Sequence, residues 1–378
     1  MEKYLRDDIP SPCYVCDEEK LEQNLQIMAR VQREADVDII LALKGFSMWS
    51  TFGLIKQYLK GATSSGVWEA RLAREEMGGE VHVFSPAYKS KDIAQLTGLV
   101  NHISFNSLAQ WHQHKDAIVN SDISAGLRVN PENQEAETPL YDPCAPGSRL
   151  GILARDLEGA DLSHINGFHV HNLCECDSYA AERTLDAIEK KFGQYLPQLH
   201  WLNIGGGHLM TREGYDVEHL IQTLKRFKAK YPNLRIIMEP GSAVAWQAGP
   251  LIAEVVDIVE NEDKIAILDI SATAHMPDVL EMPYRPTITG AGKENEKAYN
   301  YRFGGNSCLA GDVIEVYSFD EPLKPGTRLI FEDMLHYTMV KTTFFNGVEH
   351  PGIGILRKNG DFDLVRQFSY EDFKGRLS

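Results

Sequence analysis

The chain has 378 residues, of which 43% are hydrophobic and 24% charged, and its formal net charge is −16. This length allows a sizeable buried core and predicts one large domain with a smaller second one. The acidic balance argues against a nucleic-acid partner, because phosphate binding requires basic patches. Residues 1–10 lack the apolar segment of a secretory signal, and no stretch offers about 18 uninterrupted apolar residues. We therefore expect a cytoplasmic protein without a membrane partner.

Strand-like runs alternate with longer amphipathic segments through the first 250 residues. Eight runs have strand character: 37–43, 61–64, 81–84, 102–105, 125–129, 165–170, 201–204 and 235–238. Helical periodicity occupies segments between them, for example residues 67–77 and 180–192. This alternation is typical of a parallel sheet with crossover helices, and eight such units predict a closed (β/α)8 barrel of the α/β class.

The pattern changes after residue 250. Strand-like runs at 252–259, 265–270, 312–317 and 328–331 are separated by Pro and Gly turns, and the polar stretch 284–301 predicts a loop. These features predict a second, all-β domain at the C-terminal end. We expect residues 1–30 to pack on this β-domain, residues 31–250 to form the barrel, and residues 251–378 to form the β-domain.

Six cysteines are spread unevenly along the chain, which argues against a disulfide framework. Cys13 and Cys16 have the spacing of a zinc or redox site, which Cys174 and Cys176 could complete. Residues 13–16 nevertheless read as a short apolar strand, and no second C-x-x-C follows. We therefore expect free thiols and no metal.

The ends of the predicted barrel strands carry candidate functional residues, because active sites of such barrels lie at the C-terminal ends of the strands. Lys44 follows the first strand, where partial burial would lower the pKa of its amine and make it nucleophilic. A lysine that only extends into solvent is the alternative. His169 and His171 end the sixth strand on one side of it. Their H-x-H spacing makes a metal-dependent hydrolase the second hypothesis, although further His and Asp ligands are not found at other strand ends.

The last two barrel strands end in glycine-containing turns. Gly205-Gly206-Gly207 follows the seventh strand, and its backbone amides could hold a phosphate, although three glycines can also form a plain tight turn. The eighth strand is followed by Glu239-Pro240-Gly241, which sets a carboxylate at the mouth of the barrel. The combination of lysine, histidine, glycines and glutamate at successive strand ends is more specific than any one of them.

This combination resembles the fold-type III decarboxylases that use pyridoxal 5'-phosphate (PLP), the group that includes ornithine and diaminopimelate decarboxylases. Cys308-Leu309-Ala310-Gly311-Asp312 resembles their C-x-x-G-D element, and Tyr337-Thr338 with Phe345-Asn346-Gly347 resembles their late tyrosine motif. Within this group the chain resembles the carboxynorspermidine and carboxyspermidine decarboxylases most. Six phrases carry that closer resemblance: 41–44, 63–66, 148–151, 271–275, 337–341 and 370–374. The resemblance covers essentially the whole chain and implies an alanine racemase-like barrel with a C-terminal β-domain.

The resemblance implies a role for each cofactor-binding position. Lys44 would attach PLP as a Schiff base, His171 would stack on the ring, and Glu239 would keep the ring nitrogen protonated. The phosphate contacts would be Gly205, Gly206, Gly207, Gly241 and Tyr337. Two positions depart from the family pattern, because Leu173-Cys174 replaces Gly-Ser and Ser242 replaces Arg.

The resemblance also implies a substrate and an assembly. Cys308 would return a proton to the α-carbon, reaching in from the partner subunit of a homodimer with shared active sites. The substrate would be a small cationic amino acid, carboxynorspermidine or carboxyspermidine, decarboxylated in norspermidine and spermidine biosynthesis. The substrate-binding residues would be Arg149, Glu239, Asp278 and Asp312, with Glu281 next in line.

Three alternatives remain from the sequence. They are a decarboxylase of a simpler amino acid of the diaminopimelate or ornithine type, a PLP-dependent racemase, and a non-catalytic PLP-binding regulator. Retention of both Lys44 and Cys308 argues against the regulator. The C-x-x-G-D element and the late tyrosine motif argue against the racemase.

Overall fold

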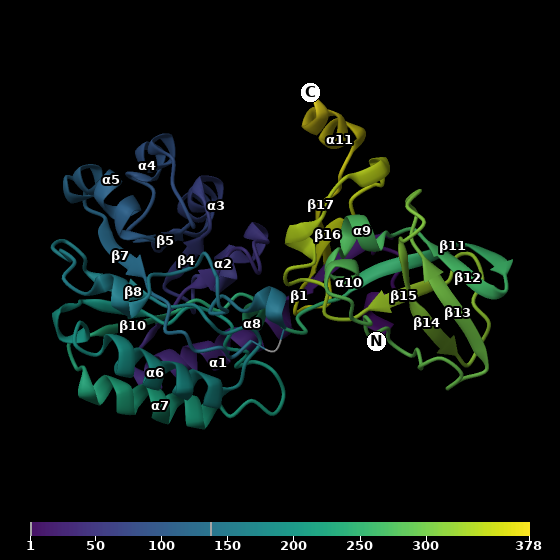
Figure 1. Ribbon diagram of the computed structural model, residues 1–378. Coiled ribbons are helices and arrows are strands. Elements are labelled where there is room, and N and C mark those ends of the chain that lie inside the picture. The colour runs from purple at the N-terminus through teal and green to yellow at the C-terminus, as the bar shows by residue number, and fades with distance from the viewer. Residues whose placement is uncertain (1, 137) are drawn as a thin grey trace. The chain divides into compact units, whose positions relative to one another are not determined.

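The computed structural model describes residues 2–136 and 138–378. Its contacts divide the chain into two compact units (Figure 1). The first unit is Glu22–Val244, and the second combines the residues up to Leu21 with Ala245–Ser378. Each unit has its own sheet, and the two sheets are described separately below.

The first unit is a barrel of parallel strands. Its strands are β2 (Asp38–Ile39), β3 (Leu41–Ala42), β4 (Gly61–Ser64), β5 (Glu80–Phe84), β6 (His102–Phe105), β7 (Ser124–Arg128), β8 (Gly167–His169), β9 (Trp201–Asn203) and β10 (Arg235–Met238). Only Ile40 separates β2 from β3, yet β2 pairs with β10 and β3 pairs with β4. Because these two short strands together occupy one position, the ring closes with eight positions and the predicted (β/α)8 barrel is confirmed.

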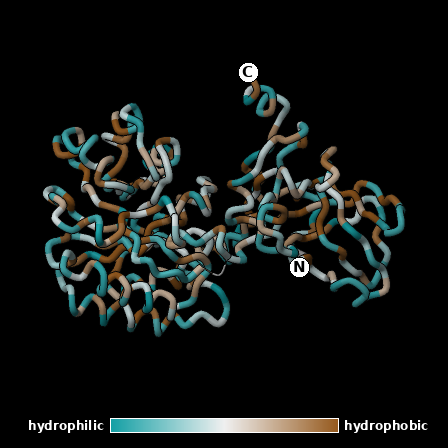
Figure 2. The backbone as a smooth tube through the Cα atoms, viewed as in Figure 1, coloured by the Kyte–Doolittle hydropathy of each residue, from teal (hydrophilic) through white to brown (hydrophobic). Residues whose placement is uncertain are grey.

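Helices surround the barrel strands in Figure 1. They are α1 (Glu18–Ala35), α2 (Phe52–Ile55), α3 (Val67–Leu72), α4 (Ser90–Leu96), α5 (Leu108–Val119), α6 (Ser178–Phe192), α7 (Val217–Lys230) and α8 (Ser242–Ala245). Hydrophilic and hydrophobic colours alternate along the outer helices in Figure 2, as expected for helices with one buried face. In α6, for example, Leu185, Ile188 and Phe192 are buried, and the Asp177 side chain caps its first turn by accepting from the Ala180 amide at 2.9 Å.

The second unit is a mixed β-sheet. Its strands are β1 (Cys13–Asp17), β11 (Leu251–Asn261), β12 (Asp263–Leu268), β13 (Tyr299–Gly304), β14 (Val313–Phe319), β15 (Arg328–Phe331), β16 (Gly352–Leu356) and β17 (Phe362–Arg366). The strand predicted at Cys13–Cys16 is β1, which pairs antiparallel with β11 and parallel with β16. Burial raises the pKa of the Cys13 thiol in β1 to about 12, so the thiol is protonated and unreactive at neutral pH.

Short helices accompany this sheet. They are α9 (Ala272–His275), α10 (Asp278–Glu281) and α11 (Tyr370–Leu377). Single turns of 3-10 or π helix occur at η1 (Glu2–Tyr4), η2 (Trp49–Thr51), η3 (Ala73–Met77), η4 (Pro139–Tyr141), η5 (Ala154–Leu157), η6 (Leu196–Gln198), η7 (Met339–Lys341) and η8 (Phe345–Gly347). Within the described residues, no helix has both the length and the apolar composition needed to cross a bilayer.

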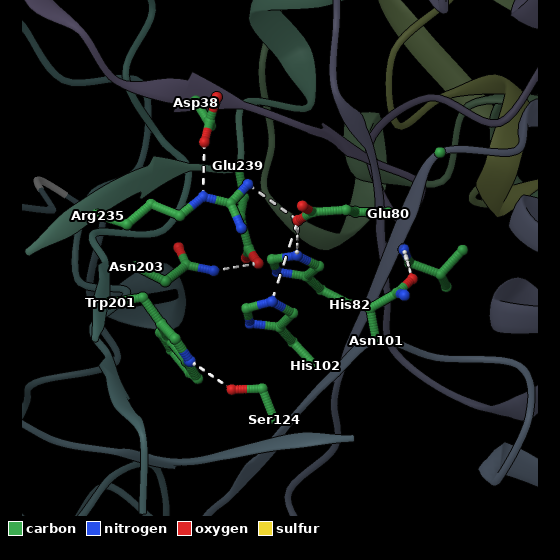
Figure 3. A network of polar contacts seen from close by, with 12 residues as sticks. Asp38, Glu80, His82, Asn101, His102, Ser124, Trp201, Asn203, Arg235 and Glu239 are labelled. Carbon is green, nitrogen blue, oxygen red and sulfur yellow. Dashed lines mark hydrogen bonds and ion pairs between the residues drawn. The ribbon is translucent and has the colours of Figure 1, made fainter. Parts of the chain in front are cut away.

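Polar side chains fill part of the barrel interior, and Figure 3 shows this layer. Glu80 Oε2 lies 3.0 Å from the Nε2 of His82 and 2.9 Å from an Arg235 guanidinium nitrogen. The His82 and His102 rings stack with centroids 4.1 Å apart. His82 and Arg235 lower the pKa of Glu80 to about 2, although burial opposes them. Both histidine rings face the Glu80 carboxylate, which already pairs with Arg235, so a polar network accounts for this cluster.

Candidate active site

Lys44 and His171 meet at the C-terminal mouth of the barrel, where Lys44 Nζ lies 2.9 Å from His171 Nε2. The Gly206 amide donates to the other ring nitrogen of His171, Nδ1, at 3.2 Å. A neutral His171 therefore carries its proton on Nε2 and donates it to the lone pair of the Lys44 amine. Burial holds the pKa of His171 well below its usual range, which favours this neutral ring.

The surroundings of the Lys44 amine disfavour its protonated form. The Lys44 side chain as a whole is exposed, but protein packs around its amine. This enclosure and the charge of Arg128 lower the pKa of Lys44. A neutral amine is the nucleophilic form that attacks an aldehyde.

The glycine turn after β9 brings backbone close to backbone. A Cβ at Gly206 would lie 2.3 Å from the Glu239 carbonyl oxygen, and one at Gly207 would lie 2.1 Å from that of Leu173. Gly207 also has a φ of +85°, which disfavours any residue with a side chain. Within the described chain, the amides of Gly207 and Gly241 donate no hydrogen bond. Such free amide donors fit an anionic group such as a phosphate.

Glu239 is a buried carboxylate at the same mouth, with 8% of its surface exposed. Its Oε1 accepts from Asn203 Nδ2 at 2.6 Å, and its Oε2 lies 3.5 Å from His169 Nε2. Burial by itself raises the pKa of Glu239, but His169 and Asn203 outweigh it and bring the pKa to about 2. Figure 3 shows the bond to Asn203. Glu239 is thus an anion at neutral pH, as required to keep a pyridine nitrogen protonated.

Two more residues of the barrel unit, Arg149 and Arg128, are candidates for contacts at the mouth of the barrel. Arg149 is exposed, and its carbonyl oxygen accepts from Asn106 Nδ2 at 2.8 Å. Arg128, the last residue of β7, was missed by the sequence reasoning although it is 4% exposed and donates to the His171 carbonyl at 3.0 Å. A charged residue at the C-terminal end of an apolar strand was the signal that could have identified it.

Cys308 lies in the second unit, in the loop between β13 and β14, and is exposed. Its backbone amide donates to Asn346 Oδ1 at 2.8 Å. Asp312 is buried and accepts from the hydroxyls of Ser271 at 2.7 Å and Ser307 at 2.6 Å. Asp312 thus links the loop around Cys308 to Ser271 within the second unit and helps to fix that loop.

The remaining predicted residues also belong to the second unit. The Lys341 side chain pairs with Asp278 and lies 3.2 Å from Glu281, so a lysine that the sequence reasoning did not consider balances the expected acidic segment. Tyr337 is half-buried with a φ of +52°, and its carbonyl oxygen accepts from the Lys341 amide at 3.0 Å. The structure thus gathers Lys44, His171, the glycine turn and Glu239 in one unit, and Cys308, Asp312, Asp278 and Tyr337 in the other.

A barrel whose mouth combines a lysine of lowered pKa, an ionised glutamate and free glycine amides matches a known class of enzymes. The sequence model of the family described as "Pyridoxal-dependent decarboxylase, C-terminal sheet domain" matches residues 13–334. The chain therefore belongs to the pyridoxal-dependent decarboxylases, and the predicted enzyme class is confirmed.

Individual relatives show which members of this family the chain resembles. The chain is 54% identical to carboxyaminopropylagmatine decarboxylase from Synechocystis sp., over 98% of this chain and 96% of that protein. It is 44% identical to carboxynorspermidine/carboxyspermidine decarboxylase from Campylobacter jejuni, over 98% of this chain and 99% of that protein. The crystal structure of carboxynorspermidine decarboxylase from Campylobacter jejuni, complexed with norspermidine, superimposes with a TM-score of 0.91 at 43% identity, covering 97% of this chain and 100% of that one. These similarities confirm the predicted resemblance to the carboxynorspermidine and carboxyspermidine decarboxylases.

Proposed function

We propose that this protein removes carbon dioxide from a carboxylated triamine, carboxynorspermidine or carboxyspermidine, in polyamine biosynthesis, with PLP as its cofactor. The observation that carries the proposal is the Lys44 amine, 2.9 Å from His171 and with a lowered pKa, in a barrel mouth that also holds the ionised Glu239. The relatives named above support the choice of substrate.

The barrel residues bind and orient the cofactor in this proposal. Lys44 would attach it covalently, His171 would lie against its ring, and Glu239 would keep its ring nitrogen protonated. Its phosphate would be held by Gly205, Gly206, Gly207 and Gly241, together with Tyr337 of the second unit. The bound PLP supplies an electron sink for the pair of electrons left on the α-carbon when carbon dioxide departs.

The second unit completes the chemistry in this proposal. Its Cys308 would give a proton to the α-carbon, and its Asp278 and Asp312 would receive the substrate together with Arg149 and Glu239 of the barrel unit. The buried position of Asp312 makes it the least available of these, because both hydroxyl donors named above already occupy its carboxylate. Asp278 and Glu281 keep one net negative charge after pairing with Lys341, which suits a cationic arm.

We propose that two copies of the chain form a dimer in which Cys308 of one copy serves Lys44 of the other. Exposed apolar side chains on each unit support the proposal that a partner chain covers these surfaces in the dimer. In the barrel unit Trp68 is 88% and Trp49 56% exposed, and beside Cys308 Leu309 is 44% exposed. Mixing Lys44→Ala with Cys308→Ala chains should then restore activity through hybrid sites, and no recovery after verified subunit exchange contradicts shared sites.

The cytoplasm is the compartment that we propose for this enzyme. All six cysteines are free thiols in the structure. A reducing compartment keeps thiols in this state.

A second candidate substrate follows from the comparison with the Synechocystis protein. That relative is named for carboxyaminopropylagmatine, and its identity to this chain, 54%, exceeds the 44% of the Campylobacter protein. The two substrate types differ in the distal group, an amine in one and a guanidinium in the other. A planar guanidinium favours a bidentate carboxylate partner, whereas an amine acts as a point charge.

Carbon dioxide release from candidate substrates tests the proposal. The substrates are carboxynorspermidine, carboxyspermidine, carboxyaminopropylagmatine, diaminopimelate and ornithine, each assayed with purified PLP-loaded protein. We expect the highest kcat/KM with a carboxylated triamine. A higher value for carboxyaminopropylagmatine selects the second candidate, and turnover of diaminopimelate or ornithine alone contradicts both.

A further inference from the structure

Arg128 is a buried guanidinium without a carboxylate partner. It is 4% exposed. Among the residues that the structure describes, 2–136 and 138–378, no acidic side chain lies within ion-pair distance of it. Isolated buried charges are strongly unfavourable, so proteins almost always pair them. The exception here lies at the end of a barrel strand, where ligands of such barrels bind.

The contacts that Arg128 does make leave its charge unbalanced. One guanidinium nitrogen donates to the neutral carbonyl of His171 at 3.0 Å, and its central carbon lies 4.4 Å from the centre of the Phe84 ring. Burial lowers the pKa of Arg128 to about 10, so the side chain still carries its charge at neutral pH. Glu239, the carboxylate that attracts it most, is itself engaged by Asn203 and His169.

The charges around Arg128 favour an incoming anion. Lys44 and Arg149 are the neighbouring basic groups, and the Arg128 charge lowers the pKa of Lys44. Neutralisation of Arg128 by an anion would remove the positive charge that opposes protonation of Lys44 and repels Arg149. The glycine turn that suits a phosphate follows β9, whereas Arg128 ends β7, two strands away around the barrel. A second anionic group of the same bound ligand is therefore the partner that fits Arg128.

We propose that Arg128 is a ligand-binding residue whose guanidinium receives an anionic oxygen at the mouth of the barrel. This inference rests on the proposed function, which supplies two such oxygens. One is the hydroxyl oxygen on the PLP ring, ionised when the cofactor is bound, and the other is the carboxylate of the substrate. Both present the same chemistry, a negatively charged oxygen entering a buried cationic site, and experiment can separate them.

A purely structural arginine would behave differently from an anion-binding one. If Arg128 serves to hold the His171 carbonyl, its removal lowers the stability of the protein without ligand. If it awaits an anion, Arg128→Met removes an unpaired buried charge while its apolar stem can still pack on Phe84. The melting temperature of the PLP-free protein should then stay equal to that of the unsubstituted protein or rise.

The first experiment measures PLP affinity in Arg128→Met and Arg128→Lys, with Arg155→Met as control. Arg155 is an exposed arginine of the same unit, so its substitution removes the same charge without touching the mouth. PLP and its ring-oxygen methyl ether are compared, because a changed Lys44 pKa would affect both equally. We expect Arg128→Met to raise the Kd of PLP about tenfold to a hundredfold more than it raises the Kd of the methyl ether. Arg128→Lys should raise the Kd of PLP less than Arg128→Met does.

The second experiment tests the carboxylate. The KM of the carboxylated triamine is compared with the Ki of its product amine, which lacks that group, in the same variants. A selective rise in this KM supports Arg128 as receptor for the substrate carboxylate, just as a selective loss of PLP affinity supports the ring oxygen. Unchanged ratios in both experiments, or a lower melting temperature of PLP-free Arg128→Met with unchanged binding, overturn the inference. Failure of the unsubstituted protein to bind PLP would instead contradict the proposed function.

Discussion

The backbone amide of Cys308 and the side-chain oxygen of Asn346 form a hydrogen bond of 2.8 Å across 38 residues of chain. Asn346 has a φ of +57°, a conformation that Asn and Gly adopt more readily than other residues. This contact fixes the loop that carries the proposed proton donor. Asn346→Gly should keep the backbone conformation but lose the acceptor. We therefore expect kcat to fall about tenfold, which corresponds to the free energy of one hydrogen bond.

The matched variant for this contact is Asn346→Asp, which keeps an acceptor oxygen at the same place. We expect it to retain most of kcat. The alkylation rate of Cys308 by iodoacetamide provides a readout apart from turnover, and it should change in Asn346→Gly only. Equal kcat in both variants would show that the loop around Cys308 does not depend on Asn346.

The lowered pKa of Lys44 predicts a stability change in the PLP-free protein. Below pH 10.5 an unfolded lysine is protonated, whereas the folded site binds that proton less well. The site therefore destabilises the fold at neutral pH, and this penalty disappears as the pH rises through 10.5. Lys44→Met should melt at a higher temperature than the unsubstituted PLP-free protein at pH 7, and the difference should shrink toward pH 10.5.

Lys56→Met serves as the control for Lys44→Met, because Lys56 is an exposed lysine of the same unit. A surface substitution of this kind changes the free energy of unfolding by less than about 0.5 kcal/mol. Calorimetry of both variants at several pH values measures the difference. A Lys44→Met protein that is less stable at pH 7 would mean that the bond to His171 outweighs the penalty.

The sequence could predict the barrel-mouth residues because each of them follows a strand within two residues. Lys44, His171 and Glu239 are local features of chain order, and the barrel topology alone brings strand ends together. Arg128 also lies at the end of a strand, but in the sequence it stands within the apolar run 125–129 and was therefore interpreted as part of the strand. Its lack of a partner is a property of the packed interior, which no local pattern contains.

The sequence could not predict pairings between distant segments. Lys341 balances Asp278 across 63 residues, and β1 pairs with β16 with Cys13 opposite Gly352. Both depend on how the second unit packs, because side-chain periodicity gives the faces of a strand but not its neighbours. For the same reason β13, which overlaps the stretch predicted as a loop, was missed.

The glycine turn after β9 predicts a contrast between two alanine substitutions. A Cβ at Gly206 would lie 2.3 Å from the Glu239 carbonyl oxygen, whereas one at Gly53 in α2 would meet no atom within 4 Å. Gly206→Ala must therefore push the turn away from Glu239, and we expect it to lower the free energy of unfolding by about 1–3 kcal/mol and to weaken PLP binding. Gly53→Ala should be neutral or stabilising by up to about 1 kcal/mol. Denaturant titrations measure both, and equal stability of the two variants would contradict the close approach.

The ion pair between Asp278 and Lys341 gives the sharpest test of substrate recognition. Asp278 was expected to bind the distal amine, but in the structure Lys341 already occupies its carboxylate, and Asp278 and Glu281 raise the pKa of Lys341 against the effect of burial. An incoming cationic arm would have to share or displace this lysine. Asp278→Asn should then lower kcat/KM for the carboxylated triamines about tenfold to a hundredfold, the range of one charge-assisted contact, without changing the absorption spectrum of bound PLP.

Lys341→Met separates the two roles that Asp278 could have. If Asp278 receives the substrate amine, removal of the lysine removes a competitor for its carboxylate, so KM for the carboxylated triamine should fall while kcat stays the same. If Asp278 only anchors Lys341, Lys341→Met should reproduce the loss seen in Asp278→Asn. Steady-state kinetics on both single variants and on the double variant distinguish these outcomes, because a shared contact makes the two effects non-additive. Full kcat/KM in Asp278→Asn would exclude Asp278 as a substrate contact and leave Glu281 as the next residue to test.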